Sequence, residues 1–456
     1  MTFGKAVWKA LSCDTMVAIL ATFMGIVIAR IITGKYSHRL GRNKGFLIEF
    51  SLIVPQGILF TTVASAYIHY FVGLLIIFLL IYILWTRALS RAKTRREFDL
   101  GSRPLCLTVV RALTHLITAV CILAIDFKSF HRPYRKSRKF GATLMDTGIG
   151  LFVLTMGLVS RRSRNWVDIR RCALRSTLPL IVLGFVRIFY NRLLKFEQDE
   201  HEYGRHMNAF FTLGITKLIG SVLSLVARTD AQLFPMACGL LLTHQLCLSF
   251  GYLSPIVMEH YFPRTTLLFA NREGIFSLPG FFAIYLLSIC FSRWLVRNTL
   301  LSYQEMLRKL RDLLLISLSC WLLMAAAHYI VGVARVTCNL GYVIWMCAIS
   351  ITMITLTIFI CDFCIDSVIS DTLISTVKDL DKLEGRETVP TYIICEALNM
   401  NGLTFFLLAN LLLSGIKYFL SPESRSSITS LLILFIYMLI TTHLICQLNR
   451  RGIRIA

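Results

Sequence analysis

Apolar runs of about twenty residues recur along the whole chain, and they limit the possible folds more than any other feature of the sequence. A helix of this length is long enough to cross the hydrocarbon core of a bilayer. No hydrophilic block between the runs is long enough for a separate soluble domain. We therefore predict an all-α polytopic membrane protein with about 13 transmembrane helices in one bundle. This bundle forms a single transmembrane domain over residues 1–456.

The predicted transmembrane helices follow these runs. Their approximate ranges are 15–33, 46–67, 69–86, 105–125, 141–160, 173–190, 207–227, 231–251, 274–291, 310–332, 341–365, 401–420 and 428–447. No small-residue cleavage site follows the first range, so we interpret it as a span and not as a removed signal peptide.

The net charge of +23 comes mostly from Lys and Arg residues in short segments between the runs. Cytosolic connections of membrane proteins carry an excess of these residues. This rule predicts a lumenal or extracellular N-terminus and a cytosolic C-terminus. The expected partner of the positive charge is the membrane lipid bilayer. A nucleic-acid partner is not expected, because no basic face carries spaced aromatic side chains.

The 14 cysteines lie mostly inside the apolar runs and are interpreted as small buried side chains. No group of His, Cys, Asp and Glu residues has the spacing of a zinc site, so no metal is expected.

One basic segment, residues 128–139, lies on the predicted lumenal side and departs from the positive-inside rule. A functional role for these basic side chains explains the departure better than membrane topology does. Clustered Arg and Lys side chains are good donors to phosphate oxygens. We predict that phosphates of a substrate are held by Arg132, Arg135, Arg138 and Lys139.

Asp126 closes the fourth apolar run, and Lys136 follows it in a loop interrupted by proline. A carboxylate at a membrane boundary is partly desolvated, which raises its proton affinity and suits a general base acting on an alcohol. Lys136 could pair with Asp126, or it could stabilise the oxyanion that develops during acyl transfer. The alternative is a simple salt bridge at the membrane interface.

A second polar motif precedes the span at 207–227 and contains Glu202, Tyr203 and His206. Glu202 and His206 are one helical turn apart, so they could meet on a helix. Such a pair could recognise a substrate hydroxyl or phosphate, or act as a second acid–base pair. A hydrated, capped loop is the alternative.

A third polar motif, Asn271, Arg272 and Glu273, precedes a span that contains Ser277. Arg272 could bind a phosphate at this helix N-terminus, or the motif could simply cap the helix. Asn410 lies in the middle of a late span, where a helix–helix hydrogen bond is the common explanation. Ionisable and amide side chains near hydrocarbon are costly, so each is a candidate functional residue.

Several familiar reaction centres are missing from the sequence. It contains no G-x-S-x-G elbow, no Walker loop and no Asp-His-His-Cys stretch. Direct transfer of an acyl group, with a base activating the acceptor hydroxyl, is the simplest chemistry that remains.

Taken together, the polar motifs resemble the glycosylphosphatidylinositol (GPI) inositol acyltransferase family, the GPI-anchored wall transfer proteins of PIG-W type. The resemblance extends from about residue 46 to the C-terminal end. It is carried by the stretches 271–280 and 399–415 and by Asp126, Phe127, Phe130, Lys136, Gly141, Leu144, Met145, Asp146, Glu200, His201, Glu202, Tyr203, Gly204, His206, Asn208, Phe211, Thr212, Arg335, Asn339, Leu340, Tyr342 and Trp345. The chain departs from the family pattern where Met207 replaces Trp, Val336 replaces Arg and Lys417 replaces Asn.

The resemblance implies a multi-span acyltransferase of the endoplasmic reticulum membrane. Such an enzyme moves a long acyl chain, usually palmitoyl, from acyl-CoA to the inositol ring of glucosaminyl-phosphatidylinositol, and it has no permanently bound cofactor. The resemblance implies Asp126 and Lys136 as the catalytic pair. The implied substrate-binding residues are Arg132, Arg135, Lys139, Asp146, Glu202, Tyr203, His206, Asn208, Asn271, Arg272, Glu273, Ser277, Arg335, Asn339 and Asn410.

The main alternative is a multi-span transporter of an anionic lipid or metabolite, which would share the buried polar groups. A transporter needs access from both sides of the membrane, often through broken helices in related halves. The sequence shows no internal repeat, and its motifs favour one side. A membrane scaffold is a third possibility, but it leaves the clustered acids and histidines unexplained.

Overall fold

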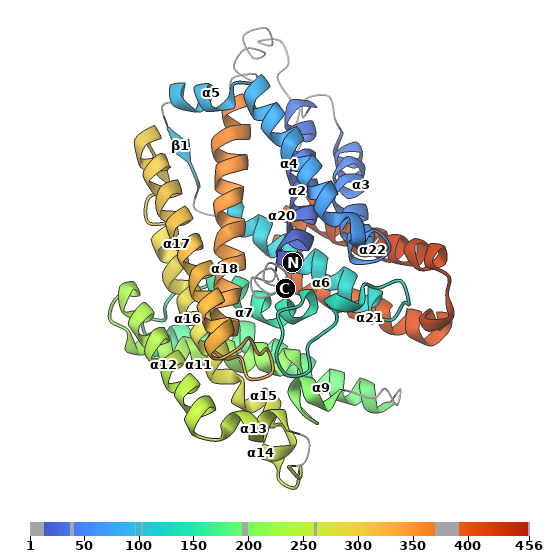
Figure 1. Cartoon of the computed structure of the whole chain (residues 1–456), viewed down its shortest axis with the longest axis vertical. Coiled ribbons are helices and arrows are strands. Elements are labelled where there is room, and N and C mark those ends of the chain that lie inside the picture. The colour runs from blue at the N-terminus through green and yellow to red at the C-terminus, as the bar shows by residue number, and fades with distance from the viewer. Residues whose placement is uncertain are drawn as a thin grey trace. The chain divides into compact units, whose positions relative to one another are not determined.

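The computed structural model describes residues 13–36, 41–95, 97–101, 104–193, 199–259, 262–369 and 392–454. These residues are mostly helical (Figure 1). Their only strands are the two-residue segments β1 (Phe98–Asp99) and β2 (Leu300–Leu301), which pair in the antiparallel direction. The prediction of an all-α polytopic fold is confirmed.

Twelve helices of the described chain are long and apolar enough to cross a membrane. They are Cys13–Tyr36, Arg42–Thr61, Ser65–Trp85, Leu105–Ala124, Trp166–Leu193, Ala209–Val226, Asp230–Phe250, Arg272–Leu295, Tyr303–Ile330, Leu340–Ile369, Gly402–Leu420 and Ser427–Arg450. The remaining predicted span, 141–160, is a shorter apolar helix, Leu144–Leu158. It is shorter because the chain from Ser137 to Thr143 is held in a loop by hydrogen bonds to Asp146.

Two of these helices contain a π-helical segment, η4 (Ala173–Thr177) and η6 (Ile358–Ile365), and two begin with a 3-10 turn, η1 (Ser65–Tyr67) and η5 (Asp230–Gln232). The elements in chain order are α2 (Cys13–Tyr36), α3 (Arg42–Thr61), η1 (Ser65–Tyr67), α4 (Ile68–Trp85), α5 (Ala88–Thr94), α6 (Leu105–Ala124), η2 (Arg132–Tyr134), η3 (Leu144–Asp146), α7 (Thr147–Leu158), α8 (Trp166–Cys172), η4 (Ala173–Thr177), α9 (Leu178–Leu193), α10 (Glu200–Tyr203), α11 (Ala209–Val226), η5 (Asp230–Gln232), α12 (Leu233–Phe250), α13 (Leu253–Met258), α14 (Leu267–Ala270), α15 (Arg272–Phe276), α16 (Leu278–Leu295), α17 (Tyr303–Ile330), α18 (Leu340–Thr357), η6 (Ile358–Ile365), α20 (Ile393–Met400), α21 (Gly402–Leu420), η7 (Pro422–Ser424) and α22 (Ser427–Arg450).

The chain divides into two compact units, each built from separate stretches of sequence. Apart from the N-terminal twelve residues, the first unit consists of Lys136–Arg297 and Ile316–Ile351. The second unit consists of Cys13–Arg135, Asn298–Leu315 and Thr352–Ala456. The prediction of one transmembrane domain over residues 1–456 stays a prediction.

Helix α16 is the centre of the first unit, where it packs against α7, α11 and α12. Small residues allow the close approach of α7. A Cβ atom added to Gly157 would lie 2.6 Å from the Cβ of Ser288 on α16, so no larger residue fits without movement. Close packing of small residues is a common way for membrane helices to associate, since lipid provides no hydrophobic driving force.

Helix α6 is the centre of the second unit, where it contacts α3, α20, α21 and α22. The buried carboxylate of Glu49 on α3 accepts hydrogen bonds from the backbone N–H groups of Ile393 and Ile394, both at 2.8 Å. The first turn of a helix leaves N–H groups without partners, so Glu49 satisfies the start of α20. By contrast, α4 exposes apolar side chains such as Leu74, Ile77 and Leu80, as expected where a helix faces lipid.

Candidate active site

Lys136 and Glu202 form an ion pair in the first unit. Glu202 lies on the short helix α10, which begins after Asp199, whose side chain accepts a hydrogen bond from the backbone N–H of His201 at 3.0 Å. Burial acts to raise the pKa of Glu202, but the positive charges of Lys136 and Arg335 outweigh it and hold the pKa below its ordinary value. Glu202 is therefore a carboxylate kept in its charged form, and it fixes the position of the Lys136 ammonium.

Asp146 is completely buried and receives donors from several sides. Its oxygens accept hydrogen bonds from the Ser137 backbone N–H at 3.2 Å, the Thr143 hydroxyl at 2.9 Å and Arg335 Nε at 3.1 Å. Its backbone carbonyl accepts the Tyr342 hydroxyl at 2.7 Å. A carboxylate whose lone pairs are occupied in this way holds several segments of the chain together.

Arg335 interacts electrostatically with both carboxylates of this cluster. Its side chain is 5% exposed and forms the ion pair with Asp146. Burial acts to lower the pKa of Arg335, but Glu202 and Asp146 outweigh this and raise it, so the guanidinium stays charged. We name the four side chains Lys136, Glu202, Arg335 and Asp146 the charged cluster. Its positive and negative side chains alternate; Arg335 and Asp146 are buried, whereas Lys136 is exposed.

Amide side chains fix the loops around the charged cluster. The Oδ1 of Asn271 accepts the backbone N–H groups of His206 at 2.7 Å and Met207 at 3.0 Å. Asn208 caps α11 and donates to the carbonyl of Gly184 at 3.0 Å. Asn339 accepts the backbone N–H groups of Ala334 and Tyr342, both at 3.0 Å. These three predicted binding residues act on backbone in this structure.

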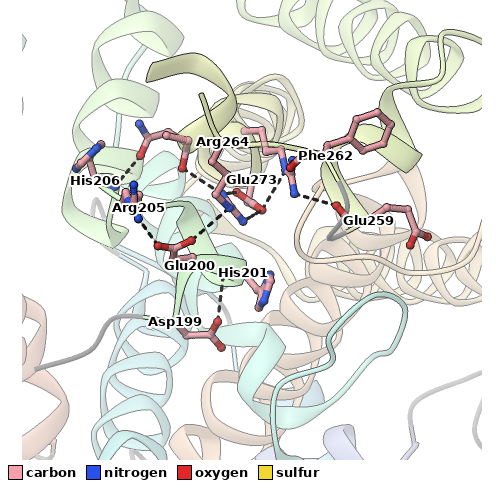
Figure 2. A network of polar contacts seen from close by, with 12 residues as sticks. Asp199, Glu200, His201, Arg205, His206, Glu259, Phe262, Arg264 and Glu273 are labelled. Carbon is pink, nitrogen blue, oxygen red and sulfur yellow. Dashed lines mark hydrogen bonds and ion pairs between the residues drawn. The ribbon is translucent and has the colours of Figure 1, made fainter. Parts of the chain in front are cut away.

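A second group of ion pairs centres on Arg264 and Glu273 (Figure 2). Arg264 donates hydrogen bonds to both carboxylate oxygens of Glu273, at 3.0 Å and 2.6 Å. The Nε of Arg264 lies 3.3 Å from the carboxylate of Glu200. Glu200 also pairs with Arg205 at 3.2 Å. A two-pronged Arg–carboxylate contact is among the strongest polar contacts available to a protein. Helices α10 and α15, which contact each other, are therefore tied through charged groups.

Arg272 is one of the largest fully buried side chains in the structure. Its guanidinium donates to the backbone carbonyls of Phe262 at 2.9 Å and Glu259 at 2.8 Å. Ser277 likewise donates to the carbonyl of Gly274 at 2.9 Å. Both side chains stabilise the start of the span that contains α16, and the role of Arg272 in phosphate binding stays a prediction.

In the second unit, Asp126 pairs with Lys417 at 3.0 Å. Their side chains are 20% and 38% exposed. Burial raises the pKa of Asp126, and Lys417 opposes this shift. The Asp126 side chain is thus partly exposed, although its Oδ2 atom, which faces Lys417, is buried. Asn410, two turns before Lys417 on α21, donates to the Phe406 carbonyl of its own helix at 2.7 Å.

The basic segment contains exposed side chains in both units. Arg132 and Arg135 are exposed in the second unit, and Arg138 is exposed in the first. Lys139 pairs with Glu259 at 2.8 Å. Exposed guanidinium groups remain able to meet a phosphate, so the phosphate-binding prediction for this segment stands untested.

The comparisons with known proteins agree with the motifs. The model of the GWT1 family matches residues 6–448. The chain belongs to the GWT1 family. The family resemblance predicted from the polar motifs is confirmed.

Three curated relatives of this GWT1 family member cover most of its length. GPI-anchored wall transfer protein 1 of Aspergillus oryzae is 30% identical over 379 residues, which are 77% of this chain and 73% of the relative. The protein of the same name from Schizosaccharomyces pombe is 29% identical over 430 residues, 90% of this chain and 89% of the relative. An uncharacterized protein of Arabidopsis thaliana is 29% identical over 415 residues, which are 90% of this chain and 88% of the relative.

The structure of this GWT1 family member brings four of the predicted motifs together in the first unit. They are residues 136–146, 200–208, 271–273 and 335–342. The roles predicted for Asp126 and Lys136 remain predictions, and each residue has a counter-ion within its own unit, Lys417 and Glu202.

The predicted meeting of Glu202 and His206 on one helix is wrong. Helix α10 ends at Tyr203, because Gly204 adopts a φ of +94° that reverses the chain. A side chain at Gly204 would collide with the backbone of Asn271, so glycine is required there. Tyr203 remains beside Glu202, and burial raises its pKa to about 12, which keeps its hydroxyl protonated.

Sequence reasoning missed three charged residues that complete these pairs: Arg264, Glu259 and Lys417. Each lies outside the motifs or at a position where the chain departs from the family pattern. These residues could have been found from the sequence because each is a charged residue near a predicted span, and such a residue needs a partner of opposite charge. Within the described residues, no group of three or more His, Cys, Asp and Glu side chains is arranged to hold a metal ion.

Proposed function

We propose that this protein transfers a long-chain acyl group, palmitoyl, from acyl-CoA to the inositol ring of glucosaminyl-phosphatidylinositol in GPI-anchor biosynthesis. Membership of the GWT1 family, across residues 6–448, is the observation that carries the proposal. The name GPI-anchored wall transfer protein 1, given to curated relatives, supports a place in the GPI pathway. A membrane-embedded chain with many apolar helices suits an acceptor that is itself a lipid.

In the proposed reaction, Asp126 takes the proton from an inositol hydroxyl. The hydroxyl oxygen attacks the thioester carbonyl, a C–O bond forms and the C–S bond breaks. The CoA thiolate leaves and receives the proton that Asp126 has taken. The partly buried position of Asp126 beside Lys417 supports this role, because burial raises the pKa of Asp126 and its side chain is still 20% exposed.

Lys136 stabilises negative charge on the thioester oxygen in this proposal. The ammonium group has three N–H donors, and Glu202 engages it without enclosing it, since Lys136 remains exposed. An oriented cation lowers the energy of an oxyanion without reorganising during the reaction. The charged cluster supports this role by holding Glu202 in its charged form.

The proposed location is the endoplasmic reticulum membrane, with a lumenal N-terminus and a cytosolic C-terminus. The distribution of Lys and Arg residues supports this orientation. Tags at each end, tested for protease access in sealed microsomes, measure it directly. A protected C-terminal tag would overturn the orientation.

The decisive experiment incubates the purified protein with labelled acyl-CoA and glucosaminyl-phosphatidylinositol. We expect an acylated inositol lipid, and Asp126→Asn should reduce kcat by roughly a hundredfold or more while the protein remains folded. Asp230→Asn is a matched control, because Asp230 is a partly exposed aspartate that pairs with a cation, Arg162, as Asp126 pairs with Lys417. A folded wild-type protein that makes no product would contradict the proposed function and favour the transporter alternative. Near-normal turnover in Asp126→Asn would contradict only the assignment of the base.

A further inference from the structure

We propose that the second unit contains a binding site for an anionic membrane phospholipid, separate from the residues assigned to acyl transfer. The site is a cavity of about 510 Å³ between the beginning of α3, helix α20 and the end of α22. All three helices belong to the second unit. No step of the proposed acyl transfer uses a residue of this cavity.

The body of the cavity is apolar. Phe46, Leu439 and Ile440 are among its lining residues, and Phe46 packs its ring against His443 with a centroid distance of 5.3 Å. Ligand cavities in proteins have volumes of roughly 300–1,000 Å³ and mostly apolar linings. An apolar cavity suits an acyl chain, because burying the chain against apolar side chains removes it from water.

The rim of the cavity is basic. Arg42 is the first residue of α3 and Arg450 is the last residue of α22, so both lie where a spanning helix reaches the membrane boundary. Arg450 Nη1 donates to the side-chain oxygen of Asn43 at 3.2 Å, which directs the guanidinium toward the start of α3. Two arginines at one membrane boundary form a suitable site for a phosphate.

One acid, Glu396, also lines the cavity. Burial raises its pKa, and the positive charge of Arg42 opposes this shift. Even with Glu396 fully charged, the two arginines leave the rim with a positive balance. The N-terminal end of α3 adds partial positive charge from its free N–H groups. The rim therefore complements a headgroup with net negative charge.

A bilayer phospholipid fits this combination better than a free anion does. A free phosphate would leave the apolar body unused, whereas a phospholipid places its phosphate at the rim and a chain in the body. The positive-inside distribution puts Arg42 and Arg450 on the predicted cytosolic side, where anionic lipids are enriched. The ligand that we propose for this cavity is thus an anionic phospholipid of the cytosolic leaflet.

The test uses full-length protein in phosphatidylcholine nanodiscs that contain a trace of photoreactive phosphatidylserine or photoreactive phosphatidylcholine. We expect phosphatidylserine to label peptides of α3 and α22 roughly tenfold more than phosphatidylcholine. The double variant Arg42→Gln, Arg450→Gln should lose this preference. Arg451→Gln is the matched control, because Arg451 is exposed and next to Arg450 but does not line the cavity.

A second variant separates the cavity from its rim. Leu439→Trp should fill the apolar body and reduce labelling by both lipids, while thermal unfolding shows that the protein is folded. Equal labelling by the two lipids in the wild-type protein, or an unchanged preference in the double arginine variant, would overturn the proposal. Displacement of the lipid by palmitoyl-CoA, with a raised KM for palmitoyl-CoA in the double variant, would also overturn it by making the acyl donor the occupant.

Discussion

Asp146 in the first unit and Asp126 in the second are both carboxylates paired with a cation, yet their surroundings differ. Asp146 is 0% exposed, and donors from Ser137, Thr143 and Arg335 surround it. Asp126 is 20% exposed and pairs with the half-exposed Lys417. The first arrangement fixes a structure, whereas the second leaves a carboxylate that can receive a proton. A charged residue near a predicted span can therefore be structural, as Asp146 is, or a candidate for catalysis, as Asp126 is. The exposure of the side chain distinguishes the two.

The largest effect in this comparison is expected from breaking the buried pair. Arg335→Met removes the cation and leaves Asp146 buried without its charge partner, which should cost about 3–5 kcal/mol of stability. Thermal unfolding in detergent measures the loss. Arg205→Met is the control, because Arg205 is 59% exposed in its pair with Glu200 and should contribute at most about 1 kcal/mol. Similar losses in the two variants would show that the charged cluster is not a stabilising core.

Removal of the proposed oxyanion cation should affect turnover and leave the fold intact. Lys136→Met keeps much of the side-chain stem and should reduce kcat by roughly a hundredfold. Its stability should change little, because the Lys136 side chain is 35% exposed. If Asp126 and Lys136 act on the same step, the double variant Asp126→Asn, Lys136→Met should lose little beyond either single variant. A kcat in the double variant that falls by the product of the two single-variant factors would contradict a shared step.

The spans were predictable because the signal is local. A run of apolar residues fits the bilayer wherever the rest of the chain lies, and twelve of the thirteen predicted ranges became long apolar helices in the described chain. The remaining range, 141–160, begins in the loop in which Thr143 binds Asp146, and hydropathy does not detect such a loop. Local hydrogen bonds, including the capping box of Thr143 and Asp146, therefore set where the helix Leu144–Leu158 begins.

The members of the site were also predictable, but their partners were not. Glu202, Asp146 and Arg335 lie next to apolar runs of the sequence. A charged side chain is energetically costly near a span, so each of the three could be recognised individually. Which cation meets which carboxylate depends on contacts between distant segments, such as Lys136 with Glu202 and Arg264 with Glu273. The supposed Glu202–His206 pair failed for a local reason, because a single glycine ended the helix between them.

A smaller effect should follow from changing the counter-ion of Asp126. Lys417 lowers the pKa of Asp126 and Glu423 raises it. A general base acts in its charged form, so activity is present above its pKa and is lost as the pH falls through it. Lys417→Met should move the acidic limb of the kcat/KM profile to higher pH, whereas Glu423→Gln should move it to lower pH. Lys417→Arg should restore the original profile, and an unchanged limb in all three variants would show that Asp126 is not the titrating group.

The smallest effect is expected from the basic segment, whose exposed charges are screened by salt. Changing Arg132, Arg135 and Arg138 to Ala leaves the Lys139–Glu259 pair intact and removes three exposed guanidinium groups. The KM for acyl-CoA or for the phosphoinositide acceptor should rise several-fold at low salt, and activity should depend less on ionic strength. The charge-matched control changes the exposed residues Arg161, Arg170 and Arg171, on the predicted cytosolic side, to Ala. An equal rise in KM for both triple variants would show that only the general surface charge matters. A rise confined to the variant of Arg132, Arg135 and Arg138 would support phosphate binding by the basic segment.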